Sequence, residues 1–257
     1  MGALEFDNVV FGYGGSLLFD GFSASFPTGS ISCIVGPNGC GKSTLAKLAM
    51  GMVKPTSGRV RVAGRDVSSL AARERARLLG VLVQQQEAPM MTARELVACG
   101  RFPSCGSFSR LSGEDEERID EALSLAGVPE LRDRLLRSLS GGQRQRVRMA
   151  MVLAQDTPIV LLDEPTSFMD VAACFDMVRL IRQVRQRGKT VVAVIHDLNL
   201  ALSVADQVFV MERGRLAVQG EPTDGCVRAA IEQSFGVRLE HVQTGCGTAW
   251  VPFESRE

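Results

Sequence analysis

The sequence has no excess of charge of either sign. Its 257 residues include 29 Lys and Arg and 29 Asp and Glu, which gives a formal net charge of zero. Proteins that bind nucleic acid through its phosphates concentrate basic residues in a patch or stripe. The balanced composition therefore gives no electrostatic reason to propose a nucleic-acid partner, and we expect none.

Paired cysteines are also lacking. The seven cysteines are an odd number, and no two of them form a C-x-x-C pair. Disulfide frameworks and zinc sites both need cysteines at regular pairings or spacings. We therefore expect a reduced, intracellular chain without a disulfide framework or a zinc site.

No apolar run approaches the ~20 residues of a membrane-spanning helix. The start, MGALEFDNVV, lacks the basic and apolar regions of a signal peptide. Phe6 stands where a myristoylation signal has Ser or Thr, and the end, ESRE, has no prenylation cysteine. Any membrane association must therefore come through a protein partner.

The composition is otherwise that of a globular protein. Hydrophobic residues make up 45% of the chain and charged residues 23%, so a substantial core can form. The length suits one large α/β domain or a core that carries a smaller subdomain.

A glycine-rich loop lies between an apolar run and an amphipathic stretch. Ile31 to Val35 predict a buried strand, and Gly36 to Ser43 spell G-x-x-x-x-G-K-S. Apolar residues at helical spacing follow from Leu45. A strand, this loop and a helix in that order are the context that a phosphate-binding P-loop needs.

The residue types of this loop suit a bound phosphate. Glycines allow φ > 0 and turn backbone N–H groups inward, while the helix N-terminus adds partial positive charge. Lys42 would reach the β- and γ-phosphates, and the Ser43 hydroxyl would ligate Mg²⁺. The alternative is a glycine-rich turn with an exposed lysine; the flanking strand and helix favour nucleotide binding. The predicted nucleotide-binding residues are Gly36, Pro37, Asn38, Gly39, Cys40, Gly41, Lys42, Ser43 and Thr44.

The region before the P-loop is rich in strands, and a later region is helical. Residues 3–10 and 22–26 have strand patterns, with a predicted turn at 11–15 between them. Thr92 and Ser112 can each cap a helix, and Gly127 and Pro129 would end the second one. We take residues 87–154 as a helical subdomain inserted into the α/β core.

Two later apolar runs predict buried parallel strands. Residues 159–162 end at Asp163 and Glu164, and residues 190–195 end at His196, with a helix over 171–187 between them. The carboxyl ends of such strands are where α/β folds place active sites. After Asp206 a hairpin turning at 213–214 is expected, and residues 221–257 are predicted to be irregular.

The segment Leu139 to Gln143, LSGGQ, precedes another helix. Its serine and glycines would form a second anion-binding N-terminus. An ordinary Ser-Gly helix start is the alternative, and it is favoured when the segment is taken alone.

Together with GPNGCGKST upstream and IVLLDEPTS downstream, LSGGQRQR resembles the ATP-binding-cassette (ABC) ATPases. The resemblance extends to about Gly220 with the motifs in family order. It implies an α/β fold with a P-loop NTPase core of ABC ATPase type, an N-terminal antiparallel β subdomain and the inserted helical subdomain. Residues 1–220 would form the ABC ATPase domain, and 221–257 a C-terminal extension packed on the core.

The resemblance also assigns roles around the phosphate. Asp163 would hold Mg²⁺, and Glu164 would orient and polarise the attacking water, since phosphoryl transfer needs a positioned nucleophile. Gln84 matches a glutamine that touches Mg²⁺ and water. His196 matches a histidine that donates to the γ-phosphate; a structural histidine is the alternative.

Further residues match nucleotide contacts of the family. Tyr13, the one tyrosine, would stack on adenine; on local grounds it could equally cover a hairpin turn. Asp170 matches the D-loop aspartate. In this family the signature residues of one subunit close over ATP on another, so the resemblance implies a head-to-tail homodimer. The signature residues are Ser140, Gly141, Gly142 and Gln143.

Finer details resemble ATPases of bacterial iron-siderophore, haem and vitamin B12 importers. They are Cys40 in the P-loop, the stretch RELVACGRFP and the segment HDLNLA after His196. The resemblance implies integral membrane permease subunits, a periplasmic or lipoprotein substrate-binding protein, and a position on the cytoplasmic face of the inner membrane. Residues 87–110 would then meet the permease.

Other functions are weighed against this one. They are an ABC transporter for another substrate, a soluble ABC ATPase without a permease, and a small-molecule kinase in which LSGGQ is a coincidence. ATP hydrolysis without phosphate transfer to an acceptor would exclude the kinase.

Cys40 has two interpretations. Loop amides and the helix N-terminus would favour its thiolate, so that alkylation inhibits and ATP protects. Alternatively, it is a small residue selected for its fit.

Overall fold

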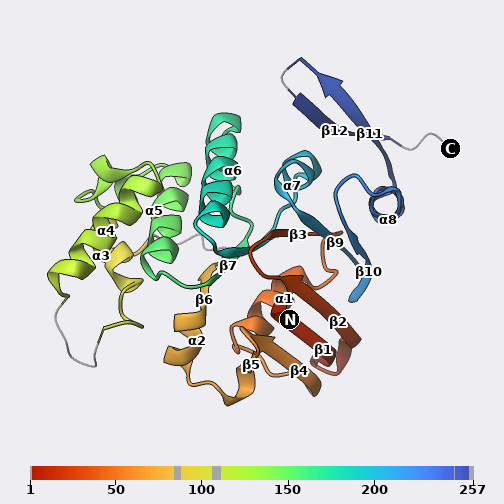
Figure 1. The fold of residues 1–257 in the computed structure, drawn as a ribbon, viewed down its shortest axis with the longest axis horizontal. Helices are drawn as coiled ribbons and strands as arrows, with labels where there is room; N and C mark the ends of the chain where they lie inside the picture. Colours follow the sequence, from red (N-terminus) through yellow and green to blue (C-terminus); the bar gives the residue numbers. More distant parts are fainter. Residues whose placement is uncertain (1, 84–87, 106–110, 246, 255–257) are drawn as a thin grey trace.

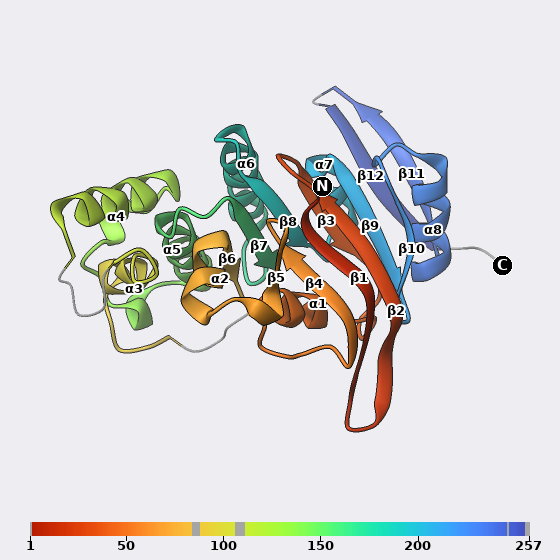
Figure 2. The same cartoon turned by 60° about the horizontal axis from the view of Figure 1, so that its bottom comes forward.

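The computed structural model describes residues 2–83, 88–105, 111–245 and 247–254. In the two ribbon views, helices α3–α5 and the hairpin β11–β12 lie at opposite ends, with the sheets between them (Figures 1 and 2). The predicted site residue Gln84 lies outside the described residues.

A six-stranded sheet of order β10-β9-β3-β8-β7-β6 forms the centre. Its strands from β9 to β6 pair in parallel, and β10 joins β9 antiparallel. The strands β3, β7 and β8 are buried at every position, which explains their continuous apolar runs. Their bounds are β3 Ile31–Val35, β6 Leu79–Leu82, β7 Ile159–Asp163, β8 Thr190–Val194, β9 Gln207–Glu212 and β10 Arg215–Gly220.

Three helices follow strands of this sheet. The helix α1 (Lys42–Ala49) follows β3 through the P-loop, α6 (Val171–Gln186) joins β7 to β8, and α7 (Leu198–Val204) follows β8. Because parallel strands end at one edge of the sheet, the loops after β3, β7 and β8 meet there.

A second, antiparallel sheet has the strand order β2-β1-β4-β5. In the sequence, β1 and β2 precede the P-loop, and β4 and β5 follow it. The strands of this sheet are longer than the sequence predicts, and the expected turn over 11–15 is only partly correct. Phe11 is buried and pairs with Phe19, so the strand continues to Tyr13, and the turn is confined to Gly14 and Gly15. The elements are β1 Gly2–Tyr13, β2 Ser16–Pro27, β4 Ser57–Val62 and β5 Arg65–Asp66, followed by α2 Ala72–Leu78.

The inserted helical region lies between β6 and β7. It contains α3 (Ala93–Cys99), α4 (Gly113–Leu125) and α5 (Gly141–Ala154), and these helices pack against one another (Figure 1). The predicted caps are confirmed, since the side chains of Thr92 and Ser112 accept hydrogen bonds from backbone N–H groups of α3 and α4.

A buried ion pair ties the three helices together. Arg101 Nε lies 2.9 Å from Asp115 Oδ1, and Arg101 Nη1 donates to the carbonyl of Ala154 over 2.6 Å. Ser112 donates to the same carboxylate from its backbone N–H and its hydroxyl. Hydrogen bonds from Ser112 first, and then Arg101, hold the pKa of Asp115 well below its ordinary value.

This pair predicts a pH-dependent stability. Asp115→Asn should lower the free energy of unfolding by about 3 kcal/mol at pH 7, because it leaves a buried arginine unpaired. The lowered pKa means that the contribution of Asp115 is complete above the pKa of an unfolded aspartate, about 3.9, and is lost as the pH falls below it. Urea unfolding of both proteins at several pH values measures the difference. A difference that does not shrink in acid would contradict the assignment.

The C-terminal region corrects a prediction. The sequence pattern predicts irregular structure over 221–257, but the described residues of this range form α8 (Gly225–Phe235) and a hairpin of β11 (Val237–Thr244) and β12 (Gly247–Glu254). Leu239 and Trp250 are buried, and the backbone N–H of Trp250 donates to Asn199 Oδ1 over 2.8 Å. Burial of these side chains against the core gives the segment the order that its pattern alone did not indicate.

Among the described residues, no helix combines the length and the apolar character that crossing a membrane requires.

Candidate functional site

The glycine loop between β3 and α1 needs glycine at two positions for steric reasons. A Cβ on Gly36 would lie 2.2 Å from the Met211 carbonyl oxygen. Gly41, the N-cap of α1, has φ 110°, and a Cβ there would lie 2.6 Å from the ring of Phe19. The loop therefore follows a backbone path that other residues cannot adopt without displacing β9 or β2.

Lys42 is buried inside this loop, with 6% of its surface exposed. Its Nζ donates to the carbonyl oxygens of Gly36 and Pro37 over 2.7 and 3.0 Å. The ammonium thus lies among the loop's backbone groups, where an anion held by the loop would meet it. This position is the one that a phosphate-binding lysine requires.

Ser43 and Asp163 meet where α1 begins and β7 ends. The Ser43 hydroxyl lies 3.5 Å from Asp163 Oδ1, and the carboxylate is nearly enclosed. Burial raises the pKa of Asp163, while the hydrogen bond from Ser43 opposes the shift. A hydroxyl and a carboxylate are hard oxygen donors, so the two residues fit Mg²⁺ together with phosphate oxygens and water.

Glu164 adopts a backbone conformation that is uncommon for its residue type, with φ 55°. Its N–H donates to the carbonyl of Val194 over 3.1 Å, which ties it to β8. Both carboxylate oxygens have partners: Ser167 Oγ donates to Oε2 over 2.8 Å, and His196 Nε2 lies 2.7 Å from Oε1. The carboxylate is therefore fixed in direction, as a group that orients water must be.

The structure brings the ends of β3, β7 and β8 together as the sequence predicts. Lys42 and Ser43 come from the P-loop side, Asp163 and Glu164 from the end of β7, and His196 from the end of β8. The arrangement can hold a phosphate chain, a magnesium ion and an attacking water molecule side by side.

The signature segment lies at the start of α5. Ser140 is the N-cap, and its hydroxyl accepts from the Gln143 N–H, while Gln143 Oε1 accepts from the Ser140 N–H. The signature residues line a surface hollow together with Phe168, Asp170 and others. Among the described residues, none of Gly36 to Thr44 lines that hollow, so the signature and the P-loop of one chain form separate surfaces.

Two further nucleotide contacts are predicted, Asp170, which lines the signature hollow, and Tyr13, which does not. Asp170 is the N-cap of α6 and accepts from the Ala173 N–H over 2.8 Å. Tyr13 is 47% exposed; its ring meets that of Phe11 edge to face, and Lys47 Nζ lies 5.9 Å from its centroid. An exposed ring face is available for stacking, and the adenine contact stays a prediction.

Cys40 corrects the thiolate prediction. Only 3% of the residue is exposed, and its Sγ packs against Gly36, where a Cβ would lie 2.9 Å from it. Burial raises the pKa of this thiol, and the nearby Lys42 charge only partly offsets the effect. The prediction of a favoured thiolate is therefore wrong, and selection for a small side chain at this position agrees with the packing.

The burial of Cys40 makes a prediction about alkylation. Iodoacetamide should modify the exposed Cys226 well before Cys40, because the latter is enclosed and protonated at neutral pH. Mass spectrometry of peptides over a time course measures both rates in one sample. Faster labelling of Cys40 than of Cys226 would contradict the burial.

Sequence reasoning gave no role to two residues that touch Glu164. Ser167 holds its carboxylate, and Gln145 Nε2, on α5, lies 3.4 Å from its carbonyl oxygen. A sequence signal for Gln145 exists: it precedes Met149 and Val152 at spacings of four and seven, which places it on the buried face of α5.

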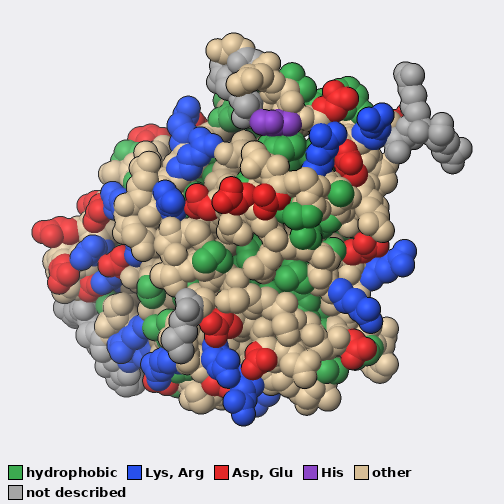
Figure 3. Space-filling model, turned by 45° about the vertical axis from the view of Figure 1, so that its right-hand side comes forward, with side chains coloured by type: hydrophobic (Ala, Val, Ile, Leu, Met, Phe, Trp, Pro, Cys, Tyr) green, Lys and Arg blue, Asp and Glu red, His purple; other side chains and the backbone are tan. Residues whose placement is uncertain are grey.

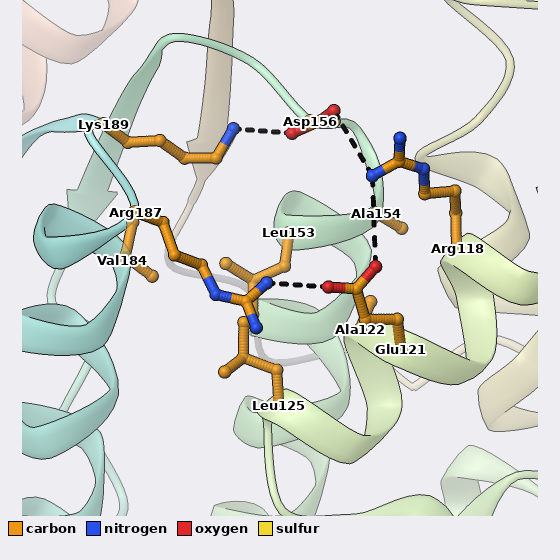
Figure 4. A pocket seen from close by; sticks show the side chains of 10 residues that line it. All are labelled: Arg118, Glu121, Ala122, Leu125, Leu153, Ala154, Asp156, Val184, Arg187 and Lys189. Atoms are coloured by element: carbon orange, nitrogen blue, oxygen red, sulfur yellow. Dashed lines mark hydrogen bonds and ion pairs between the residues drawn. The ribbon is translucent and has the colours of Figure 1, made fainter.

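The pocket in Figure 4 lies away from these motifs, between α4, α5 and α6. Glu121 pairs with Arg187, and Asp156 pairs with both Lys189 and Arg118 (Figure 4). Most of these side chains are half exposed, so each pair contributes at most about 1 kcal/mol. These bridges connect α4 with the loops that flank β7 and β8, and they do not belong to the nucleotide site.

Comparisons with known proteins agree with this geometry. The family model described as ABC transporter matches residues 19–167. The ferric enterobactin transport ATP-binding protein FepC of Escherichia coli is 38% identical over 237 residues, covering 91% of this chain and 88% of its own. The hemin import ATP-binding protein HmuV of Gloeobacter violaceus is 40% identical over 230 residues, covering 85% and 82%.

Solved structures give the same result. An inward-facing metal-chelate type ABC transporter, described as putative, matches with a TM-score of 0.85 and 26% identity over 98% of both chains. A dimeric ATP-binding cassette bound to ADP and phosphate matches with a TM-score of 0.76 and 28% identity, covering 86% of this chain and 99% of its own. The chain therefore belongs to the ABC transporter family, as one of its ATP-binding proteins.

Proposed function

We propose that this chain is the ATP-hydrolysing subunit of a bacterial importer that takes up an iron-siderophore, haem or cobalamin-type metal chelate. The observation that carries the ATPase is the fixed carboxylate of Glu164, held at both oxygens beside Lys42 and the Ser43–Asp163 pair. The importer class rests on relatives named for ferric enterobactin, iron(3+)-hydroxamate and hemin import or transport.

Each site residue would have its own task in ATP hydrolysis. Lys42 and the loop N–H groups bind the β- and γ-phosphates, and Ser43 and Asp163, with Gln84, hold Mg²⁺. When bound, the ion neutralises charge on the phosphate oxygens. Glu164 accepts a hydrogen bond from the attacking water and fixes its direction.

His196 contacts the carboxylate oxygen of Glu164 that Ser167 does not contact. Its Nε2 lies 2.7 Å from Glu164 Oε1, so the ring fixes the carboxylate. The γ-phosphate would lie beside this ring. A donor at this position stabilises charge that develops as the phosphate bond breaks.

The separation of the signature from the P-loop within one chain supports a head-to-tail homodimer. Ser140 and Gly142 would close over ATP held by Lys42 of a second copy. The dimeric cassette among the structural matches supports the association of two copies. ATP would then draw the two copies together and hydrolysis would release them.

A permease surface is proposed on the helical region. Met90 and Phe102 are 77% and 61% exposed, although both are large apolar side chains. They lie before and after α3, and large exposed apolar side chains are candidates for contact with a partner protein. We assign them to the integral membrane permease, which would hold the chain at the cytoplasmic face of the inner membrane. A periplasmic or lipoprotein substrate-binding protein would deliver the chelate.

A soluble ABC ATPase acting on nucleic acid is the second candidate. Acidic and basic side chains are interspersed on the face shown in Figure 3, which does not favour it.

Reconstitution tests the proposal. The chain is purified with the permease encoded beside its gene, placed in liposomes, and supplied with ATP, the adjacent binding protein and each chelate class in turn. We expect ATP-dependent uptake of one class and faster hydrolysis in its presence. Hydrolysis that the permease and chelates leave unchanged would contradict the importer assignment, and phosphate transfer to an acceptor would contradict the ATPase.

A further inference from the structure

We propose that Gln145 of the signature helix is a positioning residue for the catalytic carboxylate of its own chain. This inference rests on the proposed role of Glu164 in hydrolysis. It concerns the contact between Gln145 on α5 and Glu164, the residue after β7, and the proposed function gives Gln145 no part in the reaction.

The contact joins two functional segments within one chain. Gln145 is 6% exposed, and its Nε2 lies 3.4 Å from the carbonyl oxygen of Glu164. It stands one helical turn after the signature residues Ser140 and Gly142. A buried amide that lost this acceptor would leave a donor unsatisfied, so the contact constrains both partners.

Glu164 needs such constraint because its backbone is unfavourable. A non-glycine residue with φ 55° is in the left-handed region, which is unfavourable for an L-residue and persists only where its surroundings fix it. The N–H bond to Val194 fixes one side of the residue, and the Ser167 N–H and Gln145 Nε2 fix its carbonyl. Because the direction of a side chain follows its backbone torsions, a looser carbonyl displaces the carboxylate.

The residue after Gln145 on α5 makes a second contact with the segment that follows Glu164. Arg146 forms an ion pair with Asp176 on α6, beyond the D-loop. Consecutive residues of the signature helix therefore contact the chain on both sides of Ser167 to Asp170. Movement of the signature helix would be transmitted to Glu164 and the D-loop together.

In a head-to-tail dimer this contact has a consequence. The signature of each chain would serve the ATP of its partner, while Glu164 serves the ATP of its own chain. Gln145 would then link the closing of one site to the alignment of the carboxylate in the other.

The first test compares two amide-to-thioether substitutions on the same helix. Gln145→Met removes the contact with Glu164 at similar side-chain length. Gln155→Met removes a matched contact at the other end of α5, where the Gln155 amide donates to the carbonyl of Ala76. We expect Gln145→Met to lower kcat at least about 10-fold, because a displaced carboxylate is poorly aligned, with ATP affinity unchanged. A kcat like that of Gln155→Met would overturn the proposal.

Amide hydrogen exchange gives a readout that does not need turnover. Residues 164–167 should exchange faster in Gln145→Met than in the wild type, and Gln155→Met should leave them unchanged. Equal exchange in all three proteins would overturn the proposal. Turnover of the wild type, measured separately, tests the proposed ATPase alone.

Mixed dimers distinguish positioning in the same chain from an effect on the signature. In one dimer, a chain with both Gln145→Met and Glu164→Gln is paired with the wild type. In the other, the two substitutions are on opposite chains. We expect the first dimer to hydrolyse faster, because its one intact Glu164 keeps its own Gln145. Equal rates, or the reverse order, would overturn the proposal.

Discussion

Glu164→Gln should nearly abolish turnover and leave ATP binding intact. The amide of glutamine has the size of the carboxylate but lacks its negative charge. It therefore accepts a hydrogen bond from the attacking water less strongly and orients the water less well. We expect kcat to fall at least about 100-fold, the range for loss of a positioned acid–base group. ATP affinity should change less than 2-fold, which corresponds to about 0.4 kcal/mol, since Lys42 and the loop are untouched.

The same variant should accumulate as an ATP-bound dimer, because hydrolysis no longer releases the two copies. Light scattering after gel filtration with and without ATP measures the change in mass. Glu121→Gln is the matched control, since it removes a carboxylate from the pocket in Figure 4, far from the motifs. Turnover close to the wild type in Glu164→Gln would contradict the role of this residue.

Lys42→Ala should lose ATP binding itself. The Lys42 ammonium is buried in the loop and bonded to the carbonyl oxygens of Gly36 and Pro37. From there it would donate to the phosphates of ATP. Hydrogen bonds that involve a charged group contribute about 1.5–3 kcal/mol each, so ATP affinity should fall about 10- to 100-fold. Equilibrium titration with a fluorescent ATP analogue measures it.

The loss must be separated from a collapse of the loop. Lys42→Met keeps the length of the side chain without its charge and should weaken ATP binding by a similar factor. Lys54→Ala removes an exposed lysine after α1 and should bind ATP as the wild type does. Unchanged affinity in Lys42→Met would show that the charge does not bind the phosphates.

The strands and loops around the site could be predicted because two sequence signals indicate each of them. Buried parallel strands such as β7 and β8 appear as continuous apolar runs, and polar residues follow each run directly. The meeting of Ser43 with Asp163, and of Glu164 with His196, then follows from the parallel order of the strands.

The failures share a physical cause, which is packing between segments far apart in the sequence. The order of the hairpin β11–β12 depends on burying Leu239 and Trp250 against the core. The pKa of Cys40 is raised because other segments enclose the P-loop, an effect that local spacing does not reveal. The contact of Gln145 with Glu164 spans nineteen residues and two elements of the fold.

The central claim is an ATP site completed by two copies of this chain. A structure of Glu164→Gln with Mg²⁺ and ATP tests it most directly. We predict two copies related by a two-fold axis, with each ATP contacting Lys42 of one copy and Ser140 of the other. A single chain that encloses ATP while Ser140 remains remote from the nucleotide would contradict the account.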